Sequence, residues 1–424
     1  MTAIVGILNK QALAVAADSA VTIGRGRKIY NTANKIFMLS KYHPVGVAIY
    51  SNAAFNDCVP WETIIKMYRK ERGDISKNTI KEYAEDFFKY LDDFKNEHIS
   101  EQDINKALCR DVLGFWQSIV VANASGKKNP EELRKEDIPN VRKVLENVKE
   151  RCIGTVKNKI LENVSKEQFL SSISIALSLI SKQFEKCSDN YENYKGIIEE
   201  VLYTVFINKT EFVSPIYSGM AFFGFGEMDI YPVLFKTKVY LTKVSTLHWE
   251  PEEYNQVKEP PKDAIICPMG QSDEMYSFIA GVNPYMENMF YETTKNTVSL
   301  LLNSIADLTQ YENPPLSAKI RAVDLRPFID QYVGTIKQIK QNNMISPLVQ
   351  TVSSMGKEDL AELAENLVYQ TSLKRHITPN LESVGGPIDV AVVSKGDGFI
   401  WIKRKHYFKP DLNQYFFENY FGHR

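Results

Sequence analysis

Three residues near the start of the chain, Thr2, Asp18 and Lys35, have the side-chain types of a hydroxyl nucleophile and its supporting charges. A threonine hydroxyl is a weak nucleophile unless a base lies beside it. Removal of Met1 would expose such a base, because the α-amine of Thr2 would then lie on the same residue as Oγ1 and has an ordinary pKa of ~7.7–8.0. This combination indicates acyl transfer through Thr2, with its own amine as the base.

The elements that must position these residues are strands. The apolar runs AIVGIL and ALAVAA lie between Thr2 and Asp18, and their lengths and flanking turn residues are typical of buried strands. Pairing around a turn at Asn9-Lys10-Gln11 would place opposite each other residues whose numbers sum to about twenty. Thr2 would then face Asp18, with Cβ atoms ~4.5–5.5 Å apart.

Lys35 begins another strand-like run, KIFML, in which Phe37 and Leu39 share its face. An ammonium group in such a run needs an anionic partner if it is buried. Asp18 is the partner that we expect. A lysine held near the Thr2 hydroxyl would lower the pKa of that hydroxyl and help to keep the α-amine neutral.

The opening of the chain resembles that of proteasome β-subunits and of the bacterial ring protease of the same fold. The similar segments are MTAIVGI, LAVAADSAVT and NKIFML, followed by the strand VGVAIYS. The resemblance implies an α+β fold, specifically a four-layer αββα sandwich of two antiparallel sheets with helical insertions, as in N-terminal nucleophile hydrolases. It also implies that Thr2 attacks a peptide carbonyl with support from Asp18 and Lys35, although the interval between these two is one residue longer than in the family.

Later segments are similar to other parts of that family and imply further site residues. Ser51, where the family has a glycine-rich segment, would supply an oxyanion-hole N–H group, which any residue except proline can donate. In Gly270-Gln271-Ser272 the resemblance makes Ser272 a helper near the nucleophile. The remaining residues implied are Glu382 and Ser383 as catalytic helpers before the glycine pair, and Ala20, Val21 and Ile49 as lining of the substrate pocket.

Composition excludes several classes of protein. The 51 basic and 52 acidic side chains give a net charge of -1, so neither a nucleic-acid partner nor an anionic membrane is indicated. The five cysteines are far apart and form no CxxC pair, and we expect reduced thiols in a cytoplasmic protein. No signal peptide or uninterrupted apolar run of ~18 residues is seen. The scattered histidines give no zinc motif, and the mechanism needs no cofactor.

The hydrophobic pattern of the sequence changes along the chain, and these changes predict how the chain is divided into a core and insertions. Strand-like segments build a hydrolase core from residues 1–59, 212–283 and 357–408. Charged segments with apolar residues at three- and four-residue spacing predict helical insertions at 60–211 and 284–356, and an aromatic tail follows at 409–424. Near the end, Lys395-Gly396-Asp397-Gly398 predicts a tight turn between two strands.

These features together predict a proteasome-like threonine hydrolase that cleaves peptide or amide bonds. By the resemblance, its substrate would be a peptide or unfolded protein, and it could form a homo-oligomer. Two alternatives remain open at this stage. One is an amidase for small substrates on the same fold, and the other is a catalytically silent scaffold that binds partners through its helical insertions.

Overall fold

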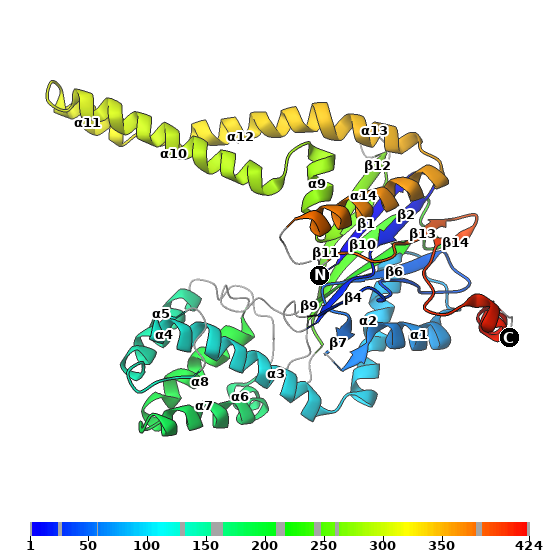
Figure 1. Cartoon of the computed structure of the whole chain (residues 1–424), viewed down its shortest axis with the longest axis horizontal. Coiled ribbons are helices and arrows are strands. Elements are labelled where there is room, and N and C mark those ends of the chain that lie inside the picture. Colours follow the sequence, from blue (N-terminus) through cyan, green and yellow to red (C-terminus); the bar gives the residue numbers. More distant parts are fainter. Residues whose placement is uncertain are drawn as a thin grey trace.

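The fold is seen in a computed structural model of the chain (Figure 1). The structure describes residues 2–23, 28–56, 58–127, 132–153, 164–208, 217–240, 247–258, 263–378 and 384–421.

Two five-stranded antiparallel sheets form the centre of the molecule. The first has the strand order β12-β1-β2-β13-β14 and the second the order β11-β10-β9-β6-β5. The strands of the first sheet are β1 (Ala3–Asn9), β2 (Leu13–Ala17), β12 (Ala264–Gly270), β13 (Asp389–Ser394) and β14 (Gly398–Lys403). Those of the second are β5 (Ile36–Met38), β6 (Val45–Tyr50), β9 (Tyr217–Gly224), β10 (Val233–Tyr240) and β11 (Trp249–Gln256). Two short hairpins, β3 (Val21–Ile23) with β4 (Lys28–Tyr30) and β7 (Ala54–Phe55) with β8 (Val59–Pro60), lie outside these sheets.

Each sheet is covered by helices on its outer face, which gives four layers. Side chains such as Ile4, Val15 and Phe223 form the core between the two sheets. The helices on the first sheet are α9 (Asp273–Ala280), α13 (Ser346–Ser354) and α14 (Lys357–Ile377), and those on the second are α1 (Trp61–Arg72) and α2 (Ile80–His98). The fold is therefore an α+β, four-layer αββα sandwich, as the resemblance of the opening segments implies.

The position of β1 in this sandwich explains its continuous apolar run. Alternate residues of a strand point to opposite faces, and here Ala3, Val5 and Ile7 face the α14 side while Ile4 and Leu8 face the other sheet. All seven residues of β1 are buried. The last hairpin is also as predicted, because β13 and β14 pair directly across the turn at residues 395–397.

The register of the first hairpin differs from the prediction by one residue. Ile4 pairs with Ala17 and Leu8 with Leu13, and the Asp18 amide donates to the Ala3 carbonyl at 3.1 Å. Asp18 therefore lies opposite Ala3, and the expected opposition of Thr2 and Asp18 is wrong. The cause is the turn, in which Asn9 Oδ1 accepts hydrogen bonds from the amides of Gln11 and Ala12 at 2.9 and 3.2 Å.

The segment predicted as the first insertion, 60–211, contains two different structures. Helices α1 and α2 belong to the sandwich, because their apolar faces pack on the second sheet. The following helices pack on one another around a separate core with Trp116, Phe169 and Phe206 at its centre. They are α3 (Glu101–Phe115), the π-helical η1 (Trp116–Val121), α4 (Ala122–Ser125), α5 (Ile138–Ile153), α6 (Lys166–Ser172), α7 (Ser174–Lys186) and α8 (Glu192–Ile207).

The segment predicted as the second insertion, 284–356, forms a long helical arm that projects from the sandwich (Figure 1). It consists of α10 (Pro284–Thr309), α11 (Pro314–Arg321), α12 (Arg326–Lys340) and the π-helical η2 (Gln341–Ile345), and it returns to the body through α13. Asn283 caps α10 by accepting from the Tyr285 amide at 2.9 Å, and Pro284 occupies the first helical position, as is common. The arm exposes large apolar side chains, including Leu308 and Tyr311.

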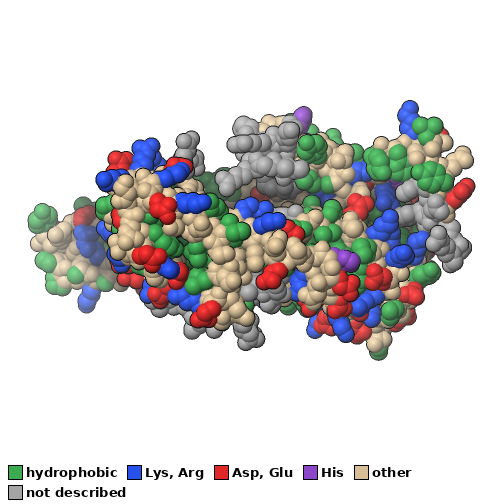
Figure 2. Space-filling model, turned by 90° about the horizontal axis from the view of Figure 1, so that it is seen from below, with side chains coloured by type: hydrophobic (Ala, Val, Ile, Leu, Met, Phe, Trp, Pro, Cys, Tyr) green, Lys and Arg blue, Asp and Glu red, His purple; other side chains and the backbone are tan. Residues whose placement is uncertain are grey.

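The C-terminal segment contains a 3₁₀ turn, η3 (Pro410–Leu412), and the short helix α15 (Gln414–Phe421). Figure 2 shows basic and acidic side chains interspersed over one face of the molecule, without a face-wide field of one sign. Among the described helices, none is both long and apolar enough to cross a membrane.

Candidate active site

Asp18 is the centre of a buried hydrogen-bond network at the end of β2. Its Oδ1 accepts from Lys35 Nζ at 2.6 Å and from the Ala3 amide at 2.9 Å. Its Oδ2 accepts from the amides of Ala20 and Gly385, both at 3.1 Å. A carboxylate with four donors is held in one orientation, and the Ala3 bond ties it directly to the peptide group that follows Thr2.

Lys35 is the cation of this network and is almost fully buried, with 4% of its surface exposed. It immediately precedes β5, and its carbonyl accepts from the Ile49 amide at 2.8 Å, which fixes its backbone against β6. Burial lowers the pKa of the Lys35 ammonium below its ordinary value, and the nearby Asp18 carboxylate offsets part of that effect. The structure thus brings Asp18 and Lys35 together as an ion pair, as the sequence suggests.

Thr2 is buried at the start of β1, beside the end of β12. The Gln271 amide donates to the Thr2 carbonyl at 2.6 Å, and Gly270 pairs with Ala3. Gly270 has a φ of 74°, and a Cβ atom there would lie 2.1 Å from the Thr2 carbonyl oxygen. Only glycine fits this close approach, so Gly270 sets the position of the Thr2 backbone.

Substitution of Gly270 by alanine should therefore destabilise the protein. We expect Gly270→Ala to lower the free energy of unfolding by about 1–3 kcal/mol, because the new Cβ is strained at this φ and collides with backbone. Urea unfolding measures the effect. Gly396→Ala is the matched control, since a Cβ at Gly396 would have no heavy atom within 4 Å. Equal stabilities of the two variants would contradict the role of Gly270.

Ser51 lies immediately after β6 and has a φ of 71°, in the left-handed region that non-glycine residues rarely adopt. Its side chain is exposed, and the residue contributes to both pockets that adjoin Thr2. Strained backbone of this kind persists where the surroundings impose it, and it is often found at functional sites. The conformation is the one that a glycine-rich segment would adopt without cost.

Relief of this strain is testable. We expect Ser51→Gly to raise the free energy of unfolding by about 0.5–1 kcal/mol, because glycine adopts positive φ readily. Ala53→Gly, two residues along the same loop, should have the opposite effect, because Ala53 is not at positive φ and glycine adds only chain entropy to the unfolded state. Thermal or urea unfolding of both variants checks the sign. A loss of stability in Ser51→Gly would contradict the strain.

Two pockets meet at Thr2. The first, of about 640 Å³, is lined by Thr2 together with Val21, Lys35, Ile49 and Ser51. The second, of about 540 Å³, is lined by Thr2, Ser51 and Ser272 among others. Both volumes suit a small ligand or a side chain of a larger one.

The structure places the other predicted residues less directly. Ala20 is fully buried and lines neither pocket, and its described role is the amide hydrogen bond to Asp18. Ser272 precedes α9, and its carbonyl accepts from the Tyr276 amide at 2.8 Å. Glu382 and Ser383 lie outside the described residues. The neighbouring segment reaches the site through Gly385, whose amide donates to Asp18 and whose carbonyl accepts from the Ser19 amide.

A polar wall of the second pocket was not predicted from the sequence. Tyr50 Oη donates to Glu252 Oε2 at 2.8 Å, and Lys238 forms an ion pair with the same carboxylate at 3.0 Å. Lys236 also lines this pocket and pairs with Glu253 at 2.7 Å. The lysines alternate along β10 and the glutamates lie on its neighbour β11, a signal that becomes visible only when the two strands are paired.

Cys267 lies behind this wall on β12, with its thiol close to Glu253. Burial raises the pKa of the Cys267 thiol to about 12. A thiol with so high a pKa is protonated at neutral pH and is a poor nucleophile. Cys267 is therefore not suited to act as a nucleophile in this site.

The four layers and the strand order define the class of fold, an αββα sandwich with its candidate site at the start of β1. No protein-family model and no curated protein sequence matches the chain. Solved structures that it is similar to include a Gly-1 mutant of Anbu from Hyphomicrobium sp. strain MC1, at 9% identity and a TM-score of 0.30 over 99% of this chain and 93% of that one. Another is Anbu, described as an ancestral beta-subunit, from Yersinia bercovieri, at 11% identity and a TM-score of 0.28 over 99% of this chain and 94% of that one.

Proposed function

We propose that this chain is an N-terminal nucleophile hydrolase that cleaves amide bonds in peptides or unfolded proteins, with Thr2 as its nucleophile after removal of Met1. The observation that carries the proposal is the position of Thr2 where two pockets meet, next to the buried Asp18–Lys35 pair. One pocket can hold substrate on one side of the scissile bond, and the second pocket can hold the other side. The Lys35 ammonium supplies a positive charge beside the nucleophile, and Asp18 fixes its position.

The reaction begins when Thr2 Oγ1 attacks the substrate carbonyl carbon. The free α-amine of Thr2 takes the hydroxyl proton as the new C–O bond forms. The positive charge of Lys35 lowers the pKa of the hydroxyl, and Asp18 holds Lys35 in place. The Ser51 amide donates to the oxyanion of the tetrahedral intermediate.

The tetrahedral intermediate then loses the amine portion of the substrate. The Thr2 α-ammonium returns its proton to the leaving nitrogen as the C–N bond breaks, which leaves an ester between substrate and Oγ1. A water molecule, deprotonated by the same amine, attacks this ester, and the α-ammonium then gives that proton to Oγ1 as the bond between Oγ1 and the acyl carbon breaks, which releases the carboxylic acid and restores the Thr2 hydroxyl. Each proton taken by the amine is returned, so the cycle needs no cofactor.

An intact-mass measurement tests the nucleophile. The protein purified from its native host is weighed before and after exposure to a peptide epoxyketone, a probe that reacts with both Oγ1 and a free α-amine of an N-terminal threonine. We expect loss of Met1 and one added probe per chain, with no adduct in Thr2→Ala. A chain in which Thr2 is not N-terminal and which takes up no probe would overturn the mechanism.

The substrate class requires a separate assay. Turnover of casein, a largely unfolded protein, is compared with turnover of a panel of small amides. Cleavage of casein is the expected result. Hydrolysis of small amides alone would favour a metabolite amidase on the same site, and a trapped adduct without turnover of either class would leave the substrate, but not the nucleophile, to be revised. Homo-oligomer formation stays a prediction that light scattering can test.

A further inference from the structure

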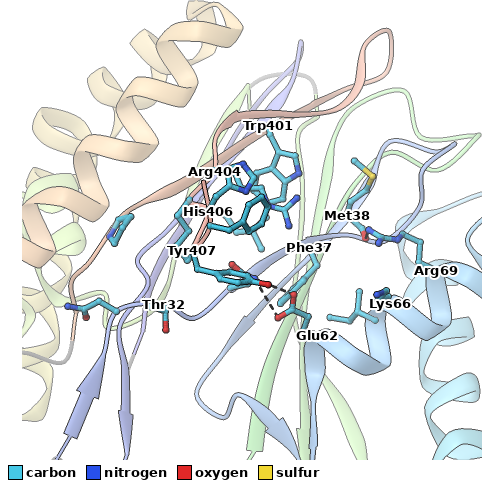
Figure 3. A pocket seen from close by; sticks show the side chains of 17 residues that line it. Thr32, Phe37, Met38, Glu62, Lys66, Arg69, Trp401, Arg404, His406 and Tyr407 are labelled. Atoms are coloured by element: carbon cyan, nitrogen blue, oxygen red, sulfur yellow. Dashed lines mark hydrogen bonds between the residues drawn. The ribbon is translucent and has the colours of Figure 1, made fainter. Parts of the chain in front are cut away.

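A separate pocket of about 400 Å³ lies at the open edge of the sandwich, between the edge strands β5 and β14 and beside α1 (Figure 3). Phe37 and Met38 of β5 form one side, Trp401 of β14 and the segment after it form another, and α1 contributes Glu62, Lys66 and Arg69. The volume is within the range of small-molecule sites in proteins. The catalytic scheme above makes no use of this pocket.

The pocket has flat aromatic walls. Trp401 of β14 lines it together with Tyr407 and Phe408 of the segment that follows, and Phe37 of β5 also contributes to the lining. Figure 3 shows Trp401, Tyr407 and Phe37 around the pocket. The Arg404 guanidinium lies over the Trp401 ring, with its central carbon 4.8 Å from the ring centroid. Such a stacked pair offers a planar surface on which another ring can lie.

The charge of the lining is positive. Lys66, Arg69 and Arg404 line the pocket, and Glu62 is the one acidic side chain among the described residues that do so. Glu62 accepts a hydrogen bond from Asn34 Nδ2 at 3.3 Å. A fourth basic residue, Lys405, is held in an ion pair with the buried Asp389 and adds little net charge.

From these features we propose that the pocket binds a small aromatic anion, a planar ring that carries a phosphate or carboxylate group. The ring lies against Trp401 and its neighbours, and the anionic group meets Arg404, Arg69 and Lys66. Arginine is suited to both tasks, because its planar guanidinium stacks on rings and donates in pairs to phosphate or carboxylate oxygens. An organic cation would meet three basic side chains, and an aliphatic molecule would use neither the rings nor the guanidinium groups.

The pocket adjoins the candidate active site. Three residues line both this pocket and the first of the two pockets at Thr2, the one that Lys35 also lines: Asn34, Phe37 and Glu62. In the chain, Asn34 immediately precedes Lys35, and Phe37 follows Lys35 by two residues. A ligand in the pocket would therefore contact residues next to Lys35 in the chain, while its binding does not depend on whether Thr2 is a nucleophile.

Calorimetric titration of the full chain tests the proposal with four probes. Adenosine monophosphate and 4-hydroxybenzoate carry a ring with phosphate or carboxylate, adenosine lacks the anion, and inorganic phosphate lacks the ring. We expect saturable binding of at least one of the first two, and affinities at least tenfold weaker for adenosine and inorganic phosphate. Which of the first two binds more tightly identifies the anionic group.

Variants locate the binding. Lys66→Glu changes an exposed residue and is expected to lower the affinity for the probe about tenfold. Arg404→Gln is expected to lower that affinity at least tenfold. Lys70→Glu, on the same helix but outside the lining, is the matched control and should change the affinity less than twofold. Absence of saturable binding by both aromatic anions would overturn the proposal. So would equal binding of inorganic phosphate, or equal effects of Lys66→Glu and Lys70→Glu.

Discussion

Replacement of Thr2 by alanine is expected to reduce amide hydrolysis by at least about 10³-fold while the protein stays folded. The substitution removes the hydroxyl but keeps a small residue after Met1, so processing of the N-terminus should be unchanged. Initial rates of casein hydrolysis measure the loss, and urea unfolding measures stability. The large effect is expected because the substitution removes the atom that forms the covalent intermediate in the proposed mechanism.

Two further variants serve as controls for the Thr2→Ala result. Thr2→Ser keeps a hydroxyl and should retain measurable turnover. Thr63→Ala removes an exposed threonine on α1 that lines neither pocket, and it should leave the rate within twofold of the original. Turnover that survives unchanged in Thr2→Ala would show that another group performs the chemistry or that an impurity supplies it.

The second large effect is expected at Lys35. Lys35→Met should lower the free energy of unfolding by about 3–5 kcal/mol, because removal of one partner leaves the buried Asp18 carboxylate without its cation. Hydrolysis should be lost as well. Lys70→Met is the matched control, and a surface substitution of this kind is usually worth less than about 0.5 kcal/mol. Equal unfolding midpoints of the two variants would contradict the importance of the pair.

The Lys35 effect should also depend on pH. Burial lowers the pKa of Lys35 in the folded protein below the ordinary value of 10.5, against the opposing influence of Asp18. At pH values between the lowered pKa of Lys35 in the folded protein and its ordinary pKa in the unfolded chain, the unfolded chain binds more protons than the folded chain. The contribution of Lys35 to the free energy of unfolding therefore rises with pH. The stability difference between the original protein and Lys35→Met should therefore widen from neutral pH to about pH 10. A difference that narrows would contradict the direction of the pKa shift.

Much of the central fold could be predicted from the sequence because its strands are buried on both faces. A run such as AIVGIL predicts a strand that is buried on both faces, whatever sequence follows it. The one-residue error in the hairpin came from the turn, since the side chain of Asn9 forms hydrogen bonds that shift its centre. Strand patterns fix which residues are buried but leave such shifts to local turn chemistry.

The helices were harder to assign, for a different physical reason. An amphipathic helix has the same periodicity whether its apolar face packs on a sheet or on other helices. Helices α1 and α2 cover the second sheet, and α3 to α8 pack on one another, yet both groups have apolar residues at similar spacing. The polar wall with Tyr50 and Glu252 was missed because three separate strands build it.

The pairing of β2 has a consequence for how the protein forms. On one side β2 pairs with β1, its neighbour in the chain, but on the other side Leu13 pairs with Val393. During synthesis at about 5–20 residues per second, the first hairpin waits on the order of tens of seconds before its second neighbour leaves the ribosome. Until then an apolar strand edge is exposed to other chains. Completion of the candidate site around Thr2 therefore waits for β13, and chains that end before β13 should aggregate rather than fold.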